Sequence, residues 1–194
     1  ANVFFIRQPE MRGTGAAIRL ARPFTGDEPF AVLYGDDVIV GQPPVTLQLM
    51  QAYEKYGLGA VGMKEVSRDR ISSYSSLKVE HREGRDYMLT DMNEKPAPGE
   101  EFSLFSILGR LVLPPEIYGI IDNTPAGAGG EIQITDSMKT LAHERGMTGV
   151  DFIGERYDMG NKFDVARAYV EQAAVHPEIG EQFCAFVREF AAKL

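Results

Sequence analysis

Apolar runs of strand length alternate with a helical stripe in the first half of the chain, and this pattern restricts the fold more than any other feature. The runs cover residues 3–7, 30–34 and 60–66. Between the second and third runs, apolar residues from 45 to 56 recur at helical spacing, and Gly57 is placed to end that helix. Continuous apolar strands separated by helices predict the α/β class, with a mostly parallel sheet covered on both faces.

The middle of the chain predicts a hairpin and a further strand. Residues 77–80 and 87–90 alternate between apolar and polar, and Glu83-Gly84-Arg85 between them suits a turn. Residues 107–113 form another apolar run. The prolines and glycines of residues 123–130 predict a tight irregular turn.

The end of the chain predicts one strand, at residues 150–154, followed by two helices. The last helix carries an aromatic and aliphatic stripe at helical spacing, typical of a face packed on the core: Phe183, Phe186, Val187 and Phe190. No linker long enough to divide the chain is visible. We therefore predict a single domain over residues 1–194, with C-terminal helices from about 163 to 194.

Composition narrows the class of protein. A hydrophobic fraction of 44% over 194 residues supports a globular core, and no apolar stretch approaches the roughly 18 residues that span a bilayer. Lys and Arg number 20 against 28 for Asp and Glu, and this net charge of -8 argues against nucleic-acid binding. The single cysteine, Cys184, excludes an intrachain disulfide. No signal peptide opens the sequence as given, and we expect a reduced, cytoplasmic protein.

Two adjacent carboxylates, Asp36 and Asp37, follow the apolar run 30–34 directly. The carboxyl ends of strands are where open α/β sheets bind ligands. One carboxylate can face a ligand while the other braces a loop, and Mg²⁺ needs only one or two carboxylates besides phosphate oxygens and water. The alternative is an Asp-Asp loop that caps the next helix.

A carboxylate and an ammonium group stand together at Glu94 and Lys95, before Pro96. Proline favours extended geometry in the preceding residue, which would place the two side chains on opposite sides of a strand end. A carboxylate can accept hydrogen bonds from sugar hydroxyls, and an ammonium group can pair with a phosphate. A solvated ion pair in a loop is the alternative.

Two further segments place polar groups at turns. Residues 127–131 form a glycine-rich turn that ends in Glu131, where the backbone can approach a ligand closely. Residues 157–162 again combine a carboxylate with a lysine after a strand. The three histidines show no metal-ligand spacing, and we expect them on the surface.

These motifs, taken in order, resemble the bacterial UTP–glucose-1-phosphate uridylyltransferases, also called UDP-glucose pyrophosphorylases. They are Arg7-Gln8 with Gly13-Thr14-Gly15-Ala16-Ala17, Phe30 to Asp37, Glu94-Lys95-Pro96, Gly109-Arg110, Gly127 to Asp136, and Arg156 to Gly160 with Lys162. The resemblance covers essentially the whole chain. It implies a Rossmann-like nucleotidyltransferase fold with a mixed sheet, and a reaction that joins UTP and glucose 1-phosphate into UDP-glucose and pyrophosphate with Mg²⁺.

The resemblance also implies roles for the nucleotide-binding residues. Gln8 and Gly13 match the pair that recognises uracil, through a side-chain amide and a close backbone approach. Asp36 and Asp158 match the aspartates on the metal side, and Asp37 is placed among the substrate-binding residues.

On the sugar side, Glu94 resembles the acceptor of sugar hydroxyls and Lys95 the lysine on the sugar phosphate. Gly109 and Glu131 fall where the family lines the glucose pocket, and Lys162 matches a further phosphate contact. The resemblance thus implies three catalytic residues, Asp36, Lys95 and Asp158.

The chain departs from the family pattern at three points. Tyr74-Ser75 stands where Tyr-Gly is usual, and Asn161 stands where aspartate is common. The Gly-rich L-x-A-G-x-G-T-R loop does not occur, so the sequence begins about a third of the way into the pattern. We therefore expect an N-terminally truncated fold that is inactive by itself and exposes an unpaired sheet edge. We expect a homo-oligomer formed through Val3 to Ile6 or through the adjacent strand.

Three functions stay open from the sequence. The first is a uridylyltransferase that acts in a full-length parent protein. The second is a sugar-nucleotide-binding or interaction module without catalysis. The third is a thymidylyl- or adenylyltransferase relative, although the stretches Gly127 to Gln133 and Arg156 to Gly160 favour the uridylyl type.

Overall fold

The computed structural model describes residues 2–194, so Ala1 lies outside the described residues. Contacts between Cα atoms divide the chain into two compact units. The first unit runs up to Tyr34 and from Gly41 to Gly154, and the second comprises Gly35–Val40 and Glu155–Leu194. The prediction of one domain over the whole chain stays a prediction.

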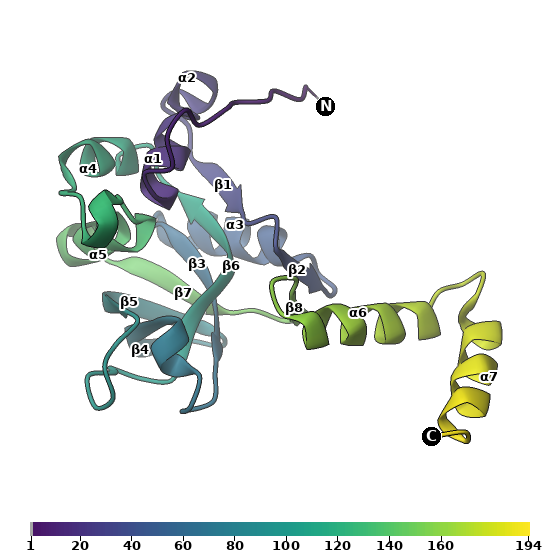
Figure 1. Ribbon diagram of the computed structural model, residues 1–194. Coiled ribbons are helices and arrows are strands. Elements are labelled where there is room, and N and C mark those ends of the chain that lie inside the picture. The colour runs from purple at the N-terminus through teal and green to yellow at the C-terminus, as the bar shows by residue number, and fades with distance from the viewer. Residues whose placement is uncertain (1) are drawn as a thin grey trace. The chain divides into compact units, whose positions relative to one another are not determined.

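The first unit is built on a six-stranded sheet with the order β1-β6-β3-β7-β5-β4 (Figure 1). Its strands are β1 (Phe30–Leu33), β3 (Ala60–Glu65), β4 (Ser75–Glu83), β5 (Asp86–Glu94), β6 (Phe105–Leu113) and β7 (Met147–Asp151). Within the described residues β3 and β7 are the parallel pair, and the other neighbours are antiparallel. The mixed sheet that the family resemblance implied is therefore confirmed.

The expectation of a mostly parallel sheet is wrong. Parallel neighbours need a crossover between them, whereas β4 and β5 are joined by a tight turn at Gly84 and must run antiparallel. Strand β6 then returns between β1 and β3 and pairs antiparallel with both. The predicted hairpin is confirmed, and the last predicted strand begins earlier than expected, at Met147.

Helices cover both faces of this sheet. They are α1 (Thr14–Arg19), α2 (Arg22–Thr25), α3 (Val45–Tyr56), α4 (Ile117–Asn123) and α5 (Ile134–Arg145), with short 3-10 turns at η1 (Ile71–Ser73) and η2 (Ala128–Gly130). The predicted helix over 45–56 is confirmed, and Gly57 ends it in the left-handed conformation, with φ of 65°.

The main core lies on the face of the sheet that α4 and α5 cover. It joins Leu111 and Leu113 of β6 to Ile117 and Ile121 of α4 and to Met138 and Leu141 of α5. Because side chains alternate along a strand, Val112 and its neighbour Ala60 are buried toward the opposite face, where α3 packs on β3, β6 and β7.

The second unit consists of a two-stranded ribbon and two helices. Strand β2 (Asp37–Val40) pairs antiparallel with β8 (Glu155–Asp158), and α6 (Lys162–Ala174) and α7 (Gly180–Ala191) follow. The predicted C-terminal helices are confirmed. No helix in residues 2–194 combines the length and apolarity that crossing a bilayer requires.

Two predictions about apolar segments are wrong. Residues 3–7 form no strand in the described part of the chain, and Val3 and Phe5 are 71% and 96% exposed. The stripe of α7 is not packed in a core either, because Phe186 and Phe190 are 59% and 52% exposed. Its aromatic rings contact one another along the helix, with centroids of Phe186 and Phe190 6.1 Å apart. Periodicity predicted the helix correctly but not what its apolar face contacts.

Because residues 3–7 are exposed, we expect substitutions there to have little effect on the stability of the fold. Phe5→Ser should change the free energy of unfolding by no more than about 0.5 kcal/mol, since the ring is solvated. Leu89→Ala, which truncates a fully buried side chain opposite Met147, should cost about 2–5 kcal/mol. Denaturant unfolding of both variants measures the difference, and a large loss for Phe5→Ser would restore the strand interpretation.

Candidate functional site

The segment that carries Gln8 and Gly13 docks on the segment that carries Glu131. The Ile132 N–H donates to the Arg12 carbonyl at 2.8 Å, and the Gly15 N–H donates to the Ile132 carbonyl at 2.9 Å. Gly13 has φ of 90°, and a Cβ atom there would lie 2.5 Å from the Ile132 carbonyl oxygen. The close backbone approach expected at Gly13 is therefore made, within the protein, to Ile132.

The predicted uracil residue Gln8 is half-buried, and its Nε2 lies 3.4 Å from the Gly13 carbonyl oxygen. It borders a cavity of about 460 Å³, together with Arg12, Ala16 and Arg19. An amide beside a cavity can both donate and accept hydrogen bonds, as recognition of a base edge requires.

A second cavity, of about 200 Å³, contains the predicted sugar residue Glu94. Its lining comes from α1, the end of β1, the segment from η1 into β4, the end of β5, β6 and the start of α5. The residues are Thr14, Tyr34, Ser73, Tyr74, Ser75, Glu94, Ile107, Gln133, Ile134, Thr135 and Met138. Strand register places Ser75 opposite Glu94. The Ser75 hydroxyl accepts the Ile107 N–H at 3.3 Å, so the hydroxyl that replaces the usual glycine is tied to β6.

Lys95 departs from the geometry that Pro96 predicts. Its φ is 46°, in the left-handed region, so the expectation of an extended residue is wrong. The Lys95 N–H donates to the Tyr74 carbonyl at 2.9 Å, and this bond holds the turn after β5. A non-glycine residue in this region costs about 1 kcal/mol or more, and such strain concentrates at functional sites. Both Glu94 and Lys95 are exposed.

Gly109 and Glu131 reach the same part of the first unit by different routes. Gly109 has φ of 85° inside β6, where the register with β3 shifts, and its carbonyl accepts the Tyr34 N–H at 3.4 Å. Glu131 precedes α5, and its Oε2 accepts a hydrogen bond from Gln133 Nε2 at 2.6 Å. Gly109 thus adjoins a residue that lines the Glu94 cavity.

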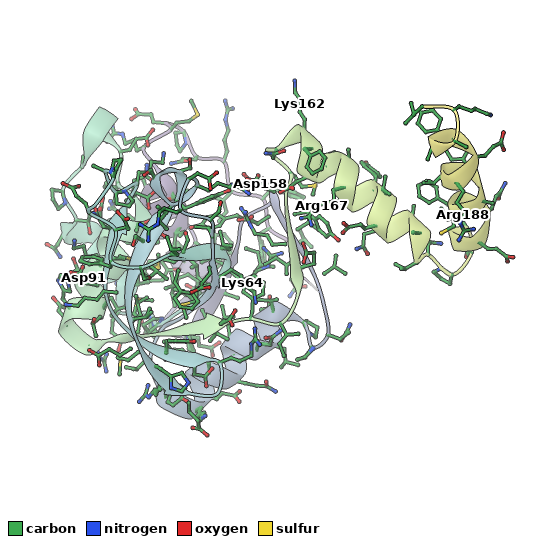
Figure 2. All side chains as sticks on the ribbon, turned by 90° about the horizontal axis from the view of Figure 1, so that it is seen from below. Lys64, Asp91, Asp158, Lys162, Arg167 and Arg188 are labelled. Carbon is green, nitrogen blue, oxygen red and sulfur yellow. The ribbon has the colours of Figure 1, made fainter. Side chains whose placement is uncertain are left out.

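The two aspartates predicted at the metal side, Asp36 and Asp158, lie in the second unit with Asp37, which was predicted to bind substrate. Pairing of β2 with β8 places Asp37 opposite Asp158, and the Met159 N–H donates to the Asp36 carbonyl at 2.8 Å. Figure 2 shows Asp158 at the end of β8 and Lys162 at the start of α6. Asp36 is exposed and Asp158 half-buried, so both carboxylates are accessible to a ligand.

Asp37 has a different role from its neighbours. Its side chain is 11% exposed, and it forms an ion pair and hydrogen bond with Arg156 across the ribbon. Burial raises the pKa of Asp37, and the hydrogen bond and charge of Arg156 lower it. The effect of burial is the larger, so the pKa lies above its ordinary value. Asp37 therefore braces the ribbon, and its assignment to the substrate stays a prediction.

Asn161, which stands where aspartate is common, caps α6. Its Oδ1 accepts the N–H groups of Phe163 and Asp164 at 2.9 and 3.2 Å. Asparagine caps helices as well as aspartate does. The first helical residue, Lys162, remains exposed, and the Gly160 N–H donates to Asp158 Oδ1 at 2.9 Å.

The predicted residues therefore form two groups, one in each unit. The first unit holds Gln8, Gly13, Glu94, Lys95, Gly109 and Glu131, and the second holds Asp36, Asp37, Asp158 and Lys162. The described residues contain no group of three or more metal-ligating side chains. A divalent ion would need further oxygen ligands from a phosphate or water.

The sequence interpretation gave no role to five polar residues of the Glu94 cavity: Thr14, Tyr34, Ser73, Gln133 and Thr135. Thr14 and Gln133 stand inside motifs that were recognised, but in those motifs the glycines and Glu131 received the roles. The sequence signal for both residues was their position: the Thr14 hydroxyl stands between Gly13 and Gly15, and the Gln133 amide stands two residues after Glu131.

Comparison with known proteins places this arrangement in context. A family model described as "Nucleotidyl transferase" matches residues 1–174. A Staphylococcus haemolyticus protein named UTP--glucose-1-phosphate uridylyltransferase is 38% identical over 189 residues, which cover 97% of this chain and 66% of that protein. The chain thus spans slightly less than two thirds of the length of this relative.

Solved structures agree with the sequence relatives. A UDP-glucose pyrophosphorylase complexed with UDP-glucose has a TM-score of 0.81 at 34% identity, covering 86% of this chain and 65% of that one. A UTP-bound UGPase from Acinetobacter baumannii has a TM-score of 0.85 at 25% identity, covering 95% and 64%.

The ion pair between Asp37 and Arg156 can be tested by titration of Asp37. Arg156→Gln should raise the pKa of Asp37 further, because the burial that raises it remains while the positive charge that lowers it is lost. Carboxyl-carbon NMR titration measures the shift, with Arg188→Gln on α7 as the control. An unchanged or lower Asp37 pKa in the Arg156 variant would refute the bracing role.

Proposed function

The chain belongs to the nucleotidyl transferase family, and we propose that the protein transfers a uridylyl group from UTP to glucose 1-phosphate. The observation that carries the proposal is 38% identity to a uridylyltransferase over 97% of the chain. In this reaction a phosphate oxygen of glucose 1-phosphate bonds to the α-phosphorus of UTP, and the bond from that phosphorus to the departing pyrophosphate breaks. Positioning and charge neutralisation supply most of the catalysis in such transfers.

The sugar would bind in the cavity that contains Glu94. A volume of about 200 Å³ suits one hexose, and the cavity is lined by carboxylate, hydroxyl and amide groups. We assign sugar hydroxyls to Glu94, with Glu131 and Gly109 as further sugar-binding residues that adjoin the cavity through Gln133 and Tyr34. The Lys95 ammonium group would pair with the sugar phosphate. Gln8 and Gly13 would recognise the uracil.

We further propose Mg²⁺ as the divalent ion that nucleotidyl transferases generally use. Asp36 and Asp158 fit this ion, since both are oxygen donors at adjacent strand ends and Mg²⁺ keeps phosphate oxygens and water in its shell. When bound, the ion neutralises charge on the nucleotide phosphates. Asp158 is oriented by the Gly160 N–H, and Lys162 would supply a further positive charge to the phosphates.

Two alternatives remain distinguishable. A putatively assigned thymidylyltransferase from Bacillus anthracis has a TM-score of 0.70 at 18% identity, a likeness that concerns the fold alone. A binding module would hold UDP-glucose without turnover. Homo-oligomerisation and a cytoplasmic location stay predictions, and the route proposed for association, a strand at Val3 to Ile6, has no support in the described structure.

Ligand preference tests the function. In titration calorimetry the chain should bind UDP-glucose at least tenfold more tightly than ADP-glucose or dTDP-glucose, and equal affinities would contradict the proposed function.

The Lys95 assignment has a separate test. Lys95→Ala should weaken the binding of UDP-glucose and glucose 1-phosphate by about one to two decades in Kd and that of UTP by less than twofold, because a charge-assisted hydrogen bond contributes about 1.5–3 kcal/mol. Lys78→Ala, in the middle of β4, is the control. Turnover of UTP with glucose 1-phosphate in a full-length parent protein would separate an enzyme from a binding module.

The metal assignment has its own test. Asp36→Ala and Asp158→Ala should each abolish most of the increase in UTP affinity that Mg²⁺ produces, because a carboxylate ligand is lost. Asp27→Ala, exposed in the loop before β1, should retain that increase. A full response to Mg²⁺ in both site variants would exclude these ligands.

A further inference from the structure

Thr14 sits where the predicted uracil segment meets the predicted sugar segment. Its hydroxyl oxygen accepts the Ile134 N–H at 3.1 Å and lies 3.0 Å from Gln133 Oε1. Gln133 Nε2 in turn donates to Glu131 Oε2 at 2.6 Å. The hydrogen bonds form a continuous relay from the first turn of α5 through Thr14 and Gln133 to Glu131.

The chemistry of the groups fixes the direction of every bond in the relay. A backbone N–H can only donate, so the Ile134 N–H uses a lone pair of the Thr14 oxygen and leaves the hydroxyl proton for Gln133 Oε1. An ionised carboxylate can only accept, so the NH₂ of Gln133 must face Glu131. The Glu131 carboxylate and the Thr14 hydroxyl therefore favour the same orientation of the amide, and Thr14 holds its carbonyl end in place.

The relay also occupies the wall of the Glu94 cavity, which Thr14 and Gln133 both line. Thr14 lies between Gly13 and Gly15, which both pack closely against the backbone of Ile132. A Cβ atom at Gly13 would clash with that backbone, so a larger residue there would push Thr14 away. The hydroxyl is therefore presented from a segment that cannot move independently of residues 131–134.

We propose that Thr14 is a positioning residue that orients Glu131 through Gln133 and so couples the uracil segment to recognition of the sugar. The inference rests on the proposed function, since it deepens the role of the same site. Glu131 would meet the sugar with its carboxylate fixed by the Gln133 amide. Sugar affinity would then depend on a residue adjacent to the base-binding Gly13.

A merely structural role for Thr14 is the competing explanation. Helix α5 begins at Ile134, and its N-cap residue Gln133 makes no side-chain capping bond, so Thr14 supplies that bond from a distant part of the chain. Two variants separate the roles. Thr14→Val removes the cap and the relay, whereas Gln133→Met removes the relay and leaves the Ile134 bond to Thr14 intact.

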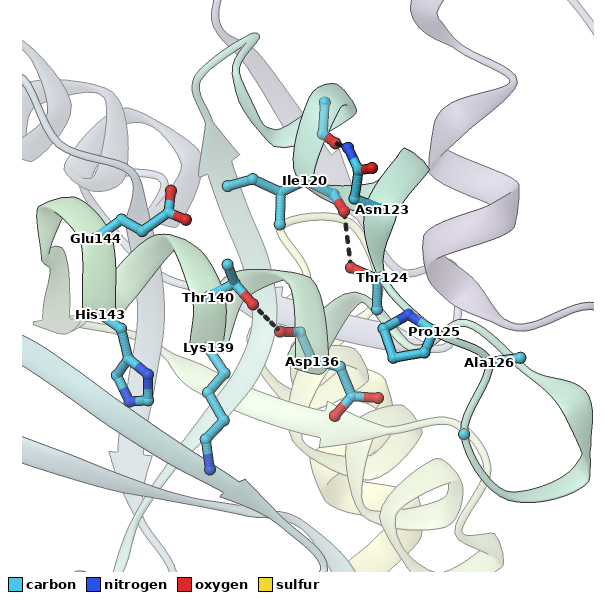
Figure 3. A pocket seen from close by; sticks show the side chains of 12 residues that line it. Ile120, Asn123, Thr124, Pro125, Ala126, Asp136, Lys139, Thr140, His143 and Glu144 are labelled. Carbon is cyan, nitrogen blue, oxygen red and sulfur yellow. Dashed lines mark hydrogen bonds between the residues drawn. The ribbon is translucent and has the colours of Figure 1, made fainter.

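The other side of α5 provides a matched control. There a larger cavity, of about 530 Å³, is lined by Asp136, Lys139, Thr140 and His143 (Figure 3). Thr140 donates to the Asp136 carbonyl at 3.3 Å and is exposed like Thr14. Thr140→Val makes the same change of side chain within α5 itself without touching the relay.

The measurement is the ratio of the Kd of UDP to the Kd of UDP-glucose, which isolates the contribution of the sugar. Thr14→Val and Gln133→Met should each lower this ratio by about 3- to 10-fold, the effect of one hydrogen bond. The double variant should lower it no further than either alone, because both break one relay. Thr14→Ser and Thr140→Val should keep it within twofold. Hydrogen exchange of the Ile134 amide should accelerate in Thr14→Val and stay unchanged in Gln133→Met.

Each failure has a distinct meaning. If Gln133→Met leaves the ratio unchanged while exchange accelerates in Thr14→Val, Thr14 is only a helix cap and the inference is overturned. Effects that multiply in the double variant would also overturn it, since the residues would act independently. If the unchanged chain binds UDP-glucose no more tightly than UDP, the proposed function fails and the inference falls with it.

Discussion

The absence of a side chain at Gly13 is the constraint on which the first unit's site depends. A Cβ atom there would lie 2.5 Å from the Ile132 carbonyl oxygen, a distance that no side chain tolerates. Only this close approach permits the reciprocal backbone bonds between Arg12, Gly15 and Ile132. These bonds join two segments more than a hundred residues apart, so elements assigned to base and to sugar form one rigid wall. The φ of 90° at Gly13 adds a second reason for glycine.

The sequence predicted individual elements better than their pairing, for a physical reason. Helix α3 was predicted from its apolar spacing and from Gly57, which are local signals. Sheet order is set by contacts between distant strands, and nothing local showed that β6 would lie between β1 and β3. Residues 3–7 have the composition of a strand but no partner strand within the described structure, and composition alone cannot supply one.

The candidate site divides in the same way. Motifs identified Glu94, Glu131, Asp36 and Asp158, because each stands at an element end where a ligand can approach. They gave no role to Thr14 and Gln133, which are joined by a hydrogen bond between residues 119 positions apart. The left-handed Lys95 was also unpredictable, since the local effect of Pro96 favours extended geometry and a bond to Tyr74 overrides it.

The charges of the second unit complete the argument for a phosphate-dependent metal site. The ribbon brings three carboxylates together, and Arg156 offsets one of them through its pair with Asp37. Arg156 Nη2 also lies 3.8 Å from Asp158 Oδ2, so its positive charge is shared between Asp37 and Asp158. In the proposed function Asp36 and Asp158 would supply the protein ligands, since Asp37 is held by Arg156, and two carboxylates are too few to enclose an ion. An ion bound there would depend on oxygens from the nucleotide, so metal and substrate would bind together.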